Sequence, residues 1–162
     1  MVNKKILYPI TEESLQNYSI DNPPLLPLYR NYSIQEEYDK YIYTDKYYIF
    51  IDNMKQILKT NLSSLQLNDF PYYTTNNIKH YVLWINKDIL NIKLNYFIKT
   101  EIDKYFTINK DINNRVKNNN SNYKTIKFPI NENVITYYIN IPKNMSIKEI
   151  LHVHIFTKSF DI

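Results

Sequence analysis

The segment from Leu151 to Thr157 alternates between aliphatic side chains and ring-bearing or polar ones. In a β-strand, successive side chains point to opposite faces, so this pattern predicts a strand with two chemically different faces. Neutral imidazole can act as a nucleophile, a general base or a metal ligand, which makes this strand the first candidate for chemistry. The aliphatic face carries Leu151, Val153 and Ile155, and the opposite face carries His152, His154 and Phe156.

Two helices are predicted before the middle of the chain. Ser33 and Glu36 have the spacing of a capping box, which predicts a helix over residues 34–43. Asp52 is suited to cap a second helix over residues 53–62. The intervening residues 47–51 are short, apolar and aromatic, and their periodicity leaves both strand and helix open.

A central strand and a long helix are predicted to follow. Residues 78–85 predict the strand, and Asn86 is suited to cap a helix over residues 87–106. On the strand, one face carries His80, Val82 and Trp84. Along the helix, a continuous apolar stripe is formed by Leu90, Leu94, Ile98, Ile102 and Phe106.

Two further strands are predicted over residues 123–130 and 134–141. In the second of them, Asn140 would share a face with His152 and His154 if the strands are neighbours. The order of elements predicts an α+β fold with a mostly antiparallel sheet, one long helix and additional N-terminal helices. The side chains of residues 134–141 that are expected to face the core are Ile135, Tyr137, Ile139 and Ile141.

The domain organisation follows from length and from two biased segments. A chain of 162 residues suits one domain, here residues 33–162. Residues 1–32 are rich in proline and tyrosine and are expected to form an extended arm on that domain. Residues 109–122 are almost wholly polar and are expected to form a flexible surface loop.

The composition says more about the expected cellular location of the protein than about its function. The sequence has no cysteine, no apolar run long enough to span a bilayer and no secretory signal at its start, so a cytoplasmic protein is expected. The net charge of +4 mildly favours anions such as nucleotides or RNA. The 17 tyrosines and the absence of glycine are typical of an AT-rich genome, such as that of a large virus or a protist, and a viral source would add a virion as a second location.

Three motifs occur in a recognisable order. They are Asn68-x-Phe-Pro-Tyr72, then His80-Tyr-Val-Leu-Trp84, then Asn140-x-Pro followed by Ile150-x-His-Val-His-Ile-Phe156. This series resembles a domain family of unknown function found mainly in fungi. It is also remotely similar to the histidine-triad (HIT) superfamily of nucleotide hydrolases and transferases. The second resemblance implies a HIT-like sheet, binding of a nucleotide or an RNA 5′ end, and a homodimer.

The HIT resemblance also implies roles for individual residues. His154 matches the histidine that attacks phosphorus and forms a nucleotidyl-histidine intermediate. His152 and Asn140 match groups that orient this histidine and contact phosphate, and His80 matches a supporting histidine on the earlier strand. Further candidates are Ser146 and Lys148 for phosphate contacts and Trp84 for stacking on a base. No cofactor or resident metal is implied.

Other interpretations remain open for the same residues. Phe156 stands where HIT hydrolases have a third histidine, and Lys79 and Pro142 replace motif glycines. These departures favour a non-catalytic structural or binding module that keeps the fold. A zinc site formed by His80, His152 and His154 is a third alternative. For Trp84, packing in the core is favoured over stacking on a base.

Overall fold

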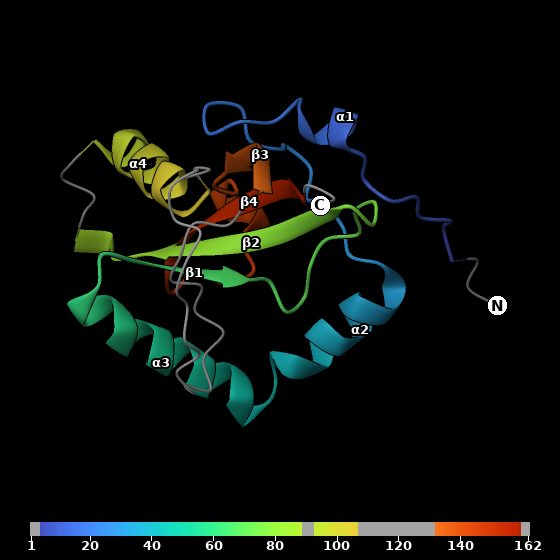
Figure 1. The fold of residues 1–162 in the computed structure, drawn as a ribbon. Coiled ribbons are helices and arrows are strands. Elements are labelled where there is room, and N and C mark those ends of the chain that lie inside the picture. The colour runs from blue at the N-terminus through green and yellow to red at the C-terminus, as the bar shows by residue number, and fades with distance from the viewer. Residues whose placement is uncertain (1–3, 89–92, 107–131, 160–162) are drawn as a thin grey trace.

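The computed structural model describes residues 4–88, 93–106 and 132–159, and a four-stranded sheet lies at its centre (Figure 1). The order in the sheet is β1-β2-β4-β3, and every neighbouring pair is antiparallel. The predicted α+β class is therefore confirmed. The strands are β1 (Ser63–Leu67), β2 (Ile78–Ile85), β3 (Glu132–Tyr138) and β4 (Leu151–Ser159). The helices are α1 (Glu12–Leu15), α2 (Tyr32–Tyr41), α3 (Asp45–Thr60) and α4 (Leu94–Phe106).

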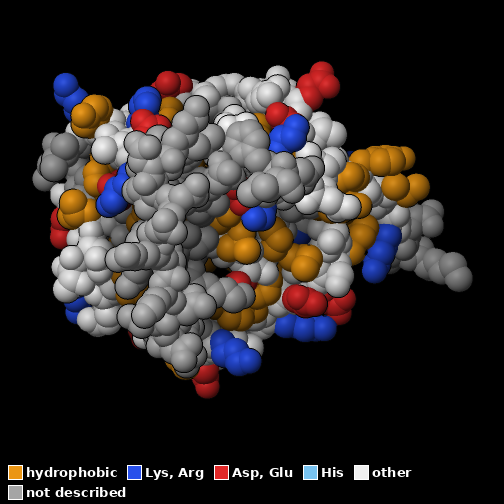
Figure 2. Space-filling model, viewed as in Figure 1, with side chains coloured by type: hydrophobic (Ala, Val, Ile, Leu, Met, Phe, Trp, Pro, Cys, Tyr) orange, Lys and Arg blue, Asp and Glu red, His pale blue; other side chains and the backbone are white. Residues whose placement is uncertain are grey.

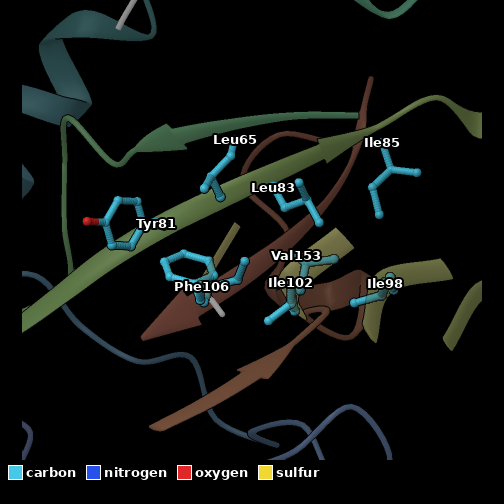
Figure 3. Packing of buried hydrophobic residues seen from close by; sticks show 9 residues of the cluster. Leu65, Tyr81, Leu83, Ile85, Ile98, Ile102, Phe106 and Val153 are labelled. Carbon is cyan, nitrogen blue, oxygen red and sulfur yellow. The ribbon is translucent and has the colours of Figure 1, made fainter. Parts of the chain in front are cut away.

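Helix α4 covers one face of the sheet (Figure 1). Its residues Ile98, Ile102 and Phe106 recur every four positions, so they share one side of the helix and all are buried. Figure 3 shows this stripe facing the aliphatic side chains of the two central strands, among them Leu83 and Val153. The alternation that predicted the aliphatic face of β4 is thus explained by packing against α4.

Helices α2 and α3 lie on the opposite face (Figure 1). Four buried residues of α3 are spaced three or four positions apart and pack on Val82 and Trp84 of β2. Both faces of β2 and β4 are therefore covered, and their histidines lie in the interior. The four residues of α3 are Tyr47, Ile51, Met54 and Leu58.

The N-terminal segment packs on the edge of the sheet formed by β3. Ile10 and Leu15 are buried in a cluster with Tyr138 and Phe156. The hydroxyl of Thr136 donates to the carbonyl of Tyr18 across 2.5 Å. This segment was expected to be extended, and it also contains the short helix α1.

Two helix boundaries differ from those predicted. Helix α2 is capped by Asn31, whose side-chain oxygen accepts from the backbone N–H of Ile34 at 2.9 Å, so Ser33 is not the cap. Helix α3 runs through Asp52 without a break, because its buried stripe continues from Tyr47 to Leu58. Residues 47–51 are thus helical, and the predicted cap at Asp52 is wrong. Across the described residues, no helix is both long and apolar enough to cross a bilayer.

The predicted start of the long helix at residue 87 is wrong, because α4 begins at Leu94 and Lys93 before it is not helical. Residues 89–92, including Leu90 of the predicted stripe, lie outside the described residues. The Asn86 side chain accepts from the backbone N–H of Asp88 at 2.9 Å and donates to the carbonyl of Leu58 at 2.7 Å. Asn86 therefore also ties the end of β2 to α3.

The outer strands differ more from prediction than the central ones. Strand β1 was not predicted from the sequence, and β3 begins at Glu132, two residues before the predicted start. The predicted strand over residues 123–130 and the loop over residues 109–122 lie outside the described residues. On β3, burial is deepest on the face opposite to the predicted one, because Ile10 and Leu15 of the N-terminal segment pack there on Tyr138. In chain order, the buried residues on this face are Glu132, Thr136, Tyr138 and Asn140.

A buried carboxylate connects three strands. Glu132 is 4% exposed and accepts hydrogen bonds from Lys79 at 2.6 Å, Tyr81 at 2.9 Å and Thr157 at 2.6 Å. Burial raises the pKa of Glu132, but these donors outweigh it and bring the pKa below its usual value. The carboxylate is therefore ionised at neutral pH and joins β2, β3 and β4.

Replacing Glu132 with Gln is expected to lower the free energy of unfolding by about 1.5–3 kcal/mol, because the charge that strengthens three hydrogen bonds is lost at nearly constant shape. Urea unfolding monitored by circular dichroism would measure this change. The matched control is Lys40→Met, which removes an exposed ion pair with Glu36 and is expected to leave the free energy of unfolding almost unchanged. Equal effects for the two variants would contradict the structural role of Glu132.

Candidate functional site

All three histidines lie on one face of the central strand pair. In the β2–β4 register, His80 is opposite Phe156, Val82 is opposite His154, and Trp84 is opposite His152. Residues opposite one another in an antiparallel pair share a face, so the imidazoles from the two strands meet. The convergence of the histidines thus follows directly from the register.

Two of the imidazoles form a closed chain of hydrogen bonds. The backbone N–H of Tyr72 donates to Nδ1 of His80 at 3.2 Å, so in the neutral ring Nε2 carries the proton. That proton is donated to Nδ1 of His154 at 2.9 Å. Nε2 of His154 must then be protonated, and the side-chain amide of Asn140 accepts this proton when its oxygen is turned toward the ring, 3.0 Å away. The fixed backbone donor of Tyr72 therefore sets the tautomer of both rings.

Aromatic rings enclose this chain. Phe156, which is fully buried, stacks on His80 with ring centroids 4.5 Å apart. Tyr72 stacks on His154 at 5.4 Å, and its hydroxyl lies 3.2 Å from the Asn140 amide. His80 and His154 are thus buried with each ring nitrogen hydrogen-bonded.

Burial also decides the charge of these rings. It lowers the pKa of His80 well below the usual value, and the charges of Arg30 and His152 lower it further. The pKa of His154 is likewise held well below 6.5 by burial, with His80, His152 and Arg30 adding to the effect. Both imidazoles are therefore neutral at physiological pH.

His152 differs from the other two histidines in its hydrogen bonding. Its Nδ1 lies 2.8 Å from the carbonyl oxygen of Ile150, so Nδ1 carries the proton and Nε2 carries the lone pair. Nε2 has no hydrogen-bond partner among the described residues, although the side chain is only 5% exposed. Burial lowers the pKa of His152 below its usual value, so the lone pair is available at neutral pH. Of the three histidines, His152 is the one that presents a free nitrogen.

His152 lines a pocket between the sheet and helices α2 and α3. The pocket has a cavity volume of about 70 Å³. Figure 2 shows hydrophobic side chains gathered on this side of the molecule. Polar and charged lining is contributed by Arg30, Gln66, Asn68, Asp69, Ser146, His152 and His154. Apolar and aromatic lining is contributed by Tyr38, Tyr41, Phe50, Leu67, Phe70, Val82, Trp84 and Ile147.

Arg30 is a pocket residue that the sequence analysis did not single out. Its guanidinium lies over the ring of Tyr38, 4.1 Å from the centroid, and 5.3 Å from that of Tyr72. Its Nε donates to the carbonyl of Phe70 at 2.8 Å. The signal that could have revealed it is the rarity of arginine in a lysine-rich chain, which contains Arg30 and Arg115 alone.

Of the other predicted site residues, some lie at the histidines or in the pocket and one does not. Asn140 contacts His154, as the predicted shared face required. Trp84 is 4% exposed, packs between Phe50 and His152, and donates to Gln66 at 3.2 Å. Ser146 lines the pocket, whereas Lys148 is exposed and does not. Within the described ranges, no group of three or more His, Cys, Asp or Glu residues is placed to hold a metal ion.

Comparisons with known proteins place the chain in a family. No curated protein matches it. A similar solved structure is the crystal structure of HTC1, which is 14% identical, with a TM-score of 0.45 over 81% of this chain and 76% of that chain. The model of one family, described as "Protein of unknown function (DUF3605)", matches residues 30–158, which is most of the sequence. The chain therefore belongs to this family.

Proposed function

We propose that this domain binds a nucleotide or an RNA 5′ end in the pocket of His152 and transfers or hydrolyses at phosphorus there. The observation that carries the proposal is the Nε2 atom of His152, an unpartnered nitrogen on a buried side chain. An imidazole with one nitrogen held by a carbonyl and the other free is the arrangement that a nucleophile or a general base requires. Trp84 and Phe50 line the same pocket and offer rings near the proposed reaction centre.

The proposed reaction has two steps at phosphorus. The lone pair of His152 Nε2 forms a bond to phosphorus while the bond to the leaving oxygen breaks with its electron pair, and that oxygen takes a proton from solvent. Water, or an acceptor hydroxyl, then bonds to phosphorus through its oxygen and releases a proton to solvent, while the phosphorus–nitrogen bond breaks and returns its electron pair to Nε2 of His152. His154 acts here as a positioning residue between His80 and Asn140.

The HIT resemblance supports a second version, in which His154 is the nucleophile. In that version, Asn140 must release Nε2 of His154 before the ring can attack. The two versions share the pocket and differ in the attacking nitrogen. Separate replacement of each histidine distinguishes them.

A non-catalytic binding or structural module is the alternative function. It is favoured by Phe156, which is fully buried and stacks on His80 at the place where HIT hydrolases have their third histidine. The closed chain from Tyr72 to Asn140 also stabilises the fold without any ligand. The homodimer and the cytoplasmic or virion location stay predictions of the sequence.

Binding is tested by thermal unfolding in the presence of nucleotides, dinucleoside polyphosphates and cap analogues. A ligand at a hundredfold excess over its Kd is expected to stabilise the folded state by about 2.7 kcal/mol. The control is Ile147→Trp, which places a large ring in the pocket and is expected to remove this gain; its unfolding without ligand reports whether it is folded. A flat response of the wild type across the screen would overturn the proposed function.

A further inference from the structure

We infer that Arg30 is the phosphate-binding residue of this pocket and that the ligand carries a terminal phosphate monoester. Such a group is found on a nucleoside 5′-monophosphate and on the 5′ end of an RNA. This inference rests on the proposed function and names its ligand class. It assigns the anion contact to the segment before α2, outside the region that the sequence analysis treated as the domain.

The guanidinium of Arg30 is held in place before any ligand arrives. Its Nε is anchored on the Phe70 carbonyl, and its plane lies over the ring of Tyr38, with Tyr72 also within cation–π distance. Its Nη1 makes one long contact of 3.5 Å with Gln35. An arginine fixed in this way loses little side-chain entropy when it binds a ligand.

The binding capacity that remains on Arg30 suits an anion. Nη2 has no hydrogen-bond partner among the described residues. The carboxylate of Asp39 on α2 interacts electrostatically with Arg30 and accepts a hydrogen bond from the side chain of Gln35 at 2.8 Å. The side chain of Asp69 lines the same pocket. The attraction to the Arg30 guanidinium grows with the charge of the ligand, so a doubly charged monoester gains more from Arg30 than a singly charged diester does, although Asp39 and Asp69 also repel it more strongly.

The size of the pocket selects an end group. Its cavity volume of about 70 Å³ is well below the roughly 300–1,000 Å³ of pockets that enclose a whole ligand. A terminal phosphate fits such a space with the rest of the ligand outside it. An internal phosphodiester would need room for chain on both sides.

The test compares ligand pairs that differ only in the 5′-phosphate. The probes are AMP against adenosine, and a 5′-phosphorylated RNA tetramer against its 5′-hydroxyl form, with Kd measured by calorimetry on wild type, Arg30→Gln and Arg30→Lys. Arg30→Gln is expected to weaken binding of the phosphorylated probes by about 10- to 100-fold and to leave the others unchanged. Arg30→Lys keeps the charge but loses the paired N–H donors of the guanidinium, so its Kd for the phosphorylated probes should lie between those of the wild type and Arg30→Gln. If AMP binds tightly and the RNA does not, the phosphate monoester comes from a free nucleotide. If the RNA binds tightly and AMP does not, it comes from an RNA 5′ end.

The control is Lys46→Gln, an equal change of charge at an exposed position of α3, which should bind as the wild type does. If Arg30→Gln is not folded, wild-type NMR decides, because the chain has two arginines and the Arg30 Nε signal should shift with AMP and not with adenosine. The inference is overturned if folded Arg30→Gln binds the phosphorylated probes as tightly as the wild type does, or if the Arg30 Nε signal does not shift with AMP. In either case, binding of the probes by the wild type still upholds the proposed function. If the wild type binds none of the probes, the proposed function fails as well.

Discussion

A His152→Asn variant is expected to lose at least roughly 10²-fold in turnover at phosphorus while keeping its affinity for the ligand. The asparagine amide can still donate to the carbonyl of Ile150, as Nδ1 of His152 does across 2.8 Å. No atom of asparagine replaces Nε2, so the variant removes the lone pair together with the ring that packs on Trp84. Steady-state kinetics would measure this as a fall in kcat with little change in KM.

His154→Asn provides the contrast on the same strand. His154 is bonded to His80 and Asn140, so its loss should lower the free energy of unfolding and reduce binding and turnover together. Turnover that disappears in His154→Asn at unchanged stability, and persists in His152→Asn, would instead assign the attack to His154. Turnover that survives both replacements would mean that neither imidazole attacks phosphorus.

The central strands were predictable because their signals are local. The alternation of residues 151–157 and the apolar run of residues 78–85 place β4 and β2 without knowledge of any partner. All three histidines lie on the same face of these two strands. Their convergence therefore also followed once the strands were taken as neighbours. The contact between Asn140 and His154 followed from the same face argument.

The roles of the individual imidazoles could not be predicted in this way. They depend on the backbone N–H of Tyr72 and the carbonyl of Ile150, whose directions are set by the chain path and not by residue type. Arg30 reaches the pocket through packing against Tyr38, on the helix that follows it, and through the carbonyl of Phe70, which is 40 residues away. Contacts of this kind leave no periodic trace in the sequence.

The missed strand β1 has a similar cause. Ser63–Leu67 is short, and its polar residues Ser64 and Gln66 interrupt the apolar pattern. Its pairing with β2 supplies the missing stabilisation, and Gln66 accepts from the indole of Trp84. Tertiary context, which sequence propensity does not contain, therefore decides the edge of this sheet.

Acid is expected to destabilise the protein between pH 7 and pH 5, by at most about 4 kcal/mol. Burial holds the pKa of His80 and of His154 well below 6.5, aided by Arg30 and the neighbouring imidazoles. As the pH falls through 6.5, the unfolded chain takes up a proton at each of these histidines and the folded protein does not. Each histidine then costs at most roughly 2 kcal/mol by pH 5, so stability is greatest above pH 6.5 and is lost below it.

Urea unfolding at the two pH values would measure this loss, and the window isolates the histidines because most carboxylates titrate at roughly pH 4. His152→Asn is the control, since it retains the His80–His154 pair and should keep most of the pH dependence. In the folded protein, the ring signals of His80 and His154 should not titrate over this range by NMR. Equal unfolding free energies at pH 7 and pH 5 would mean that these rings accept protons without unfolding, and the closed chain from Tyr72 to Asn140 would then not describe the site.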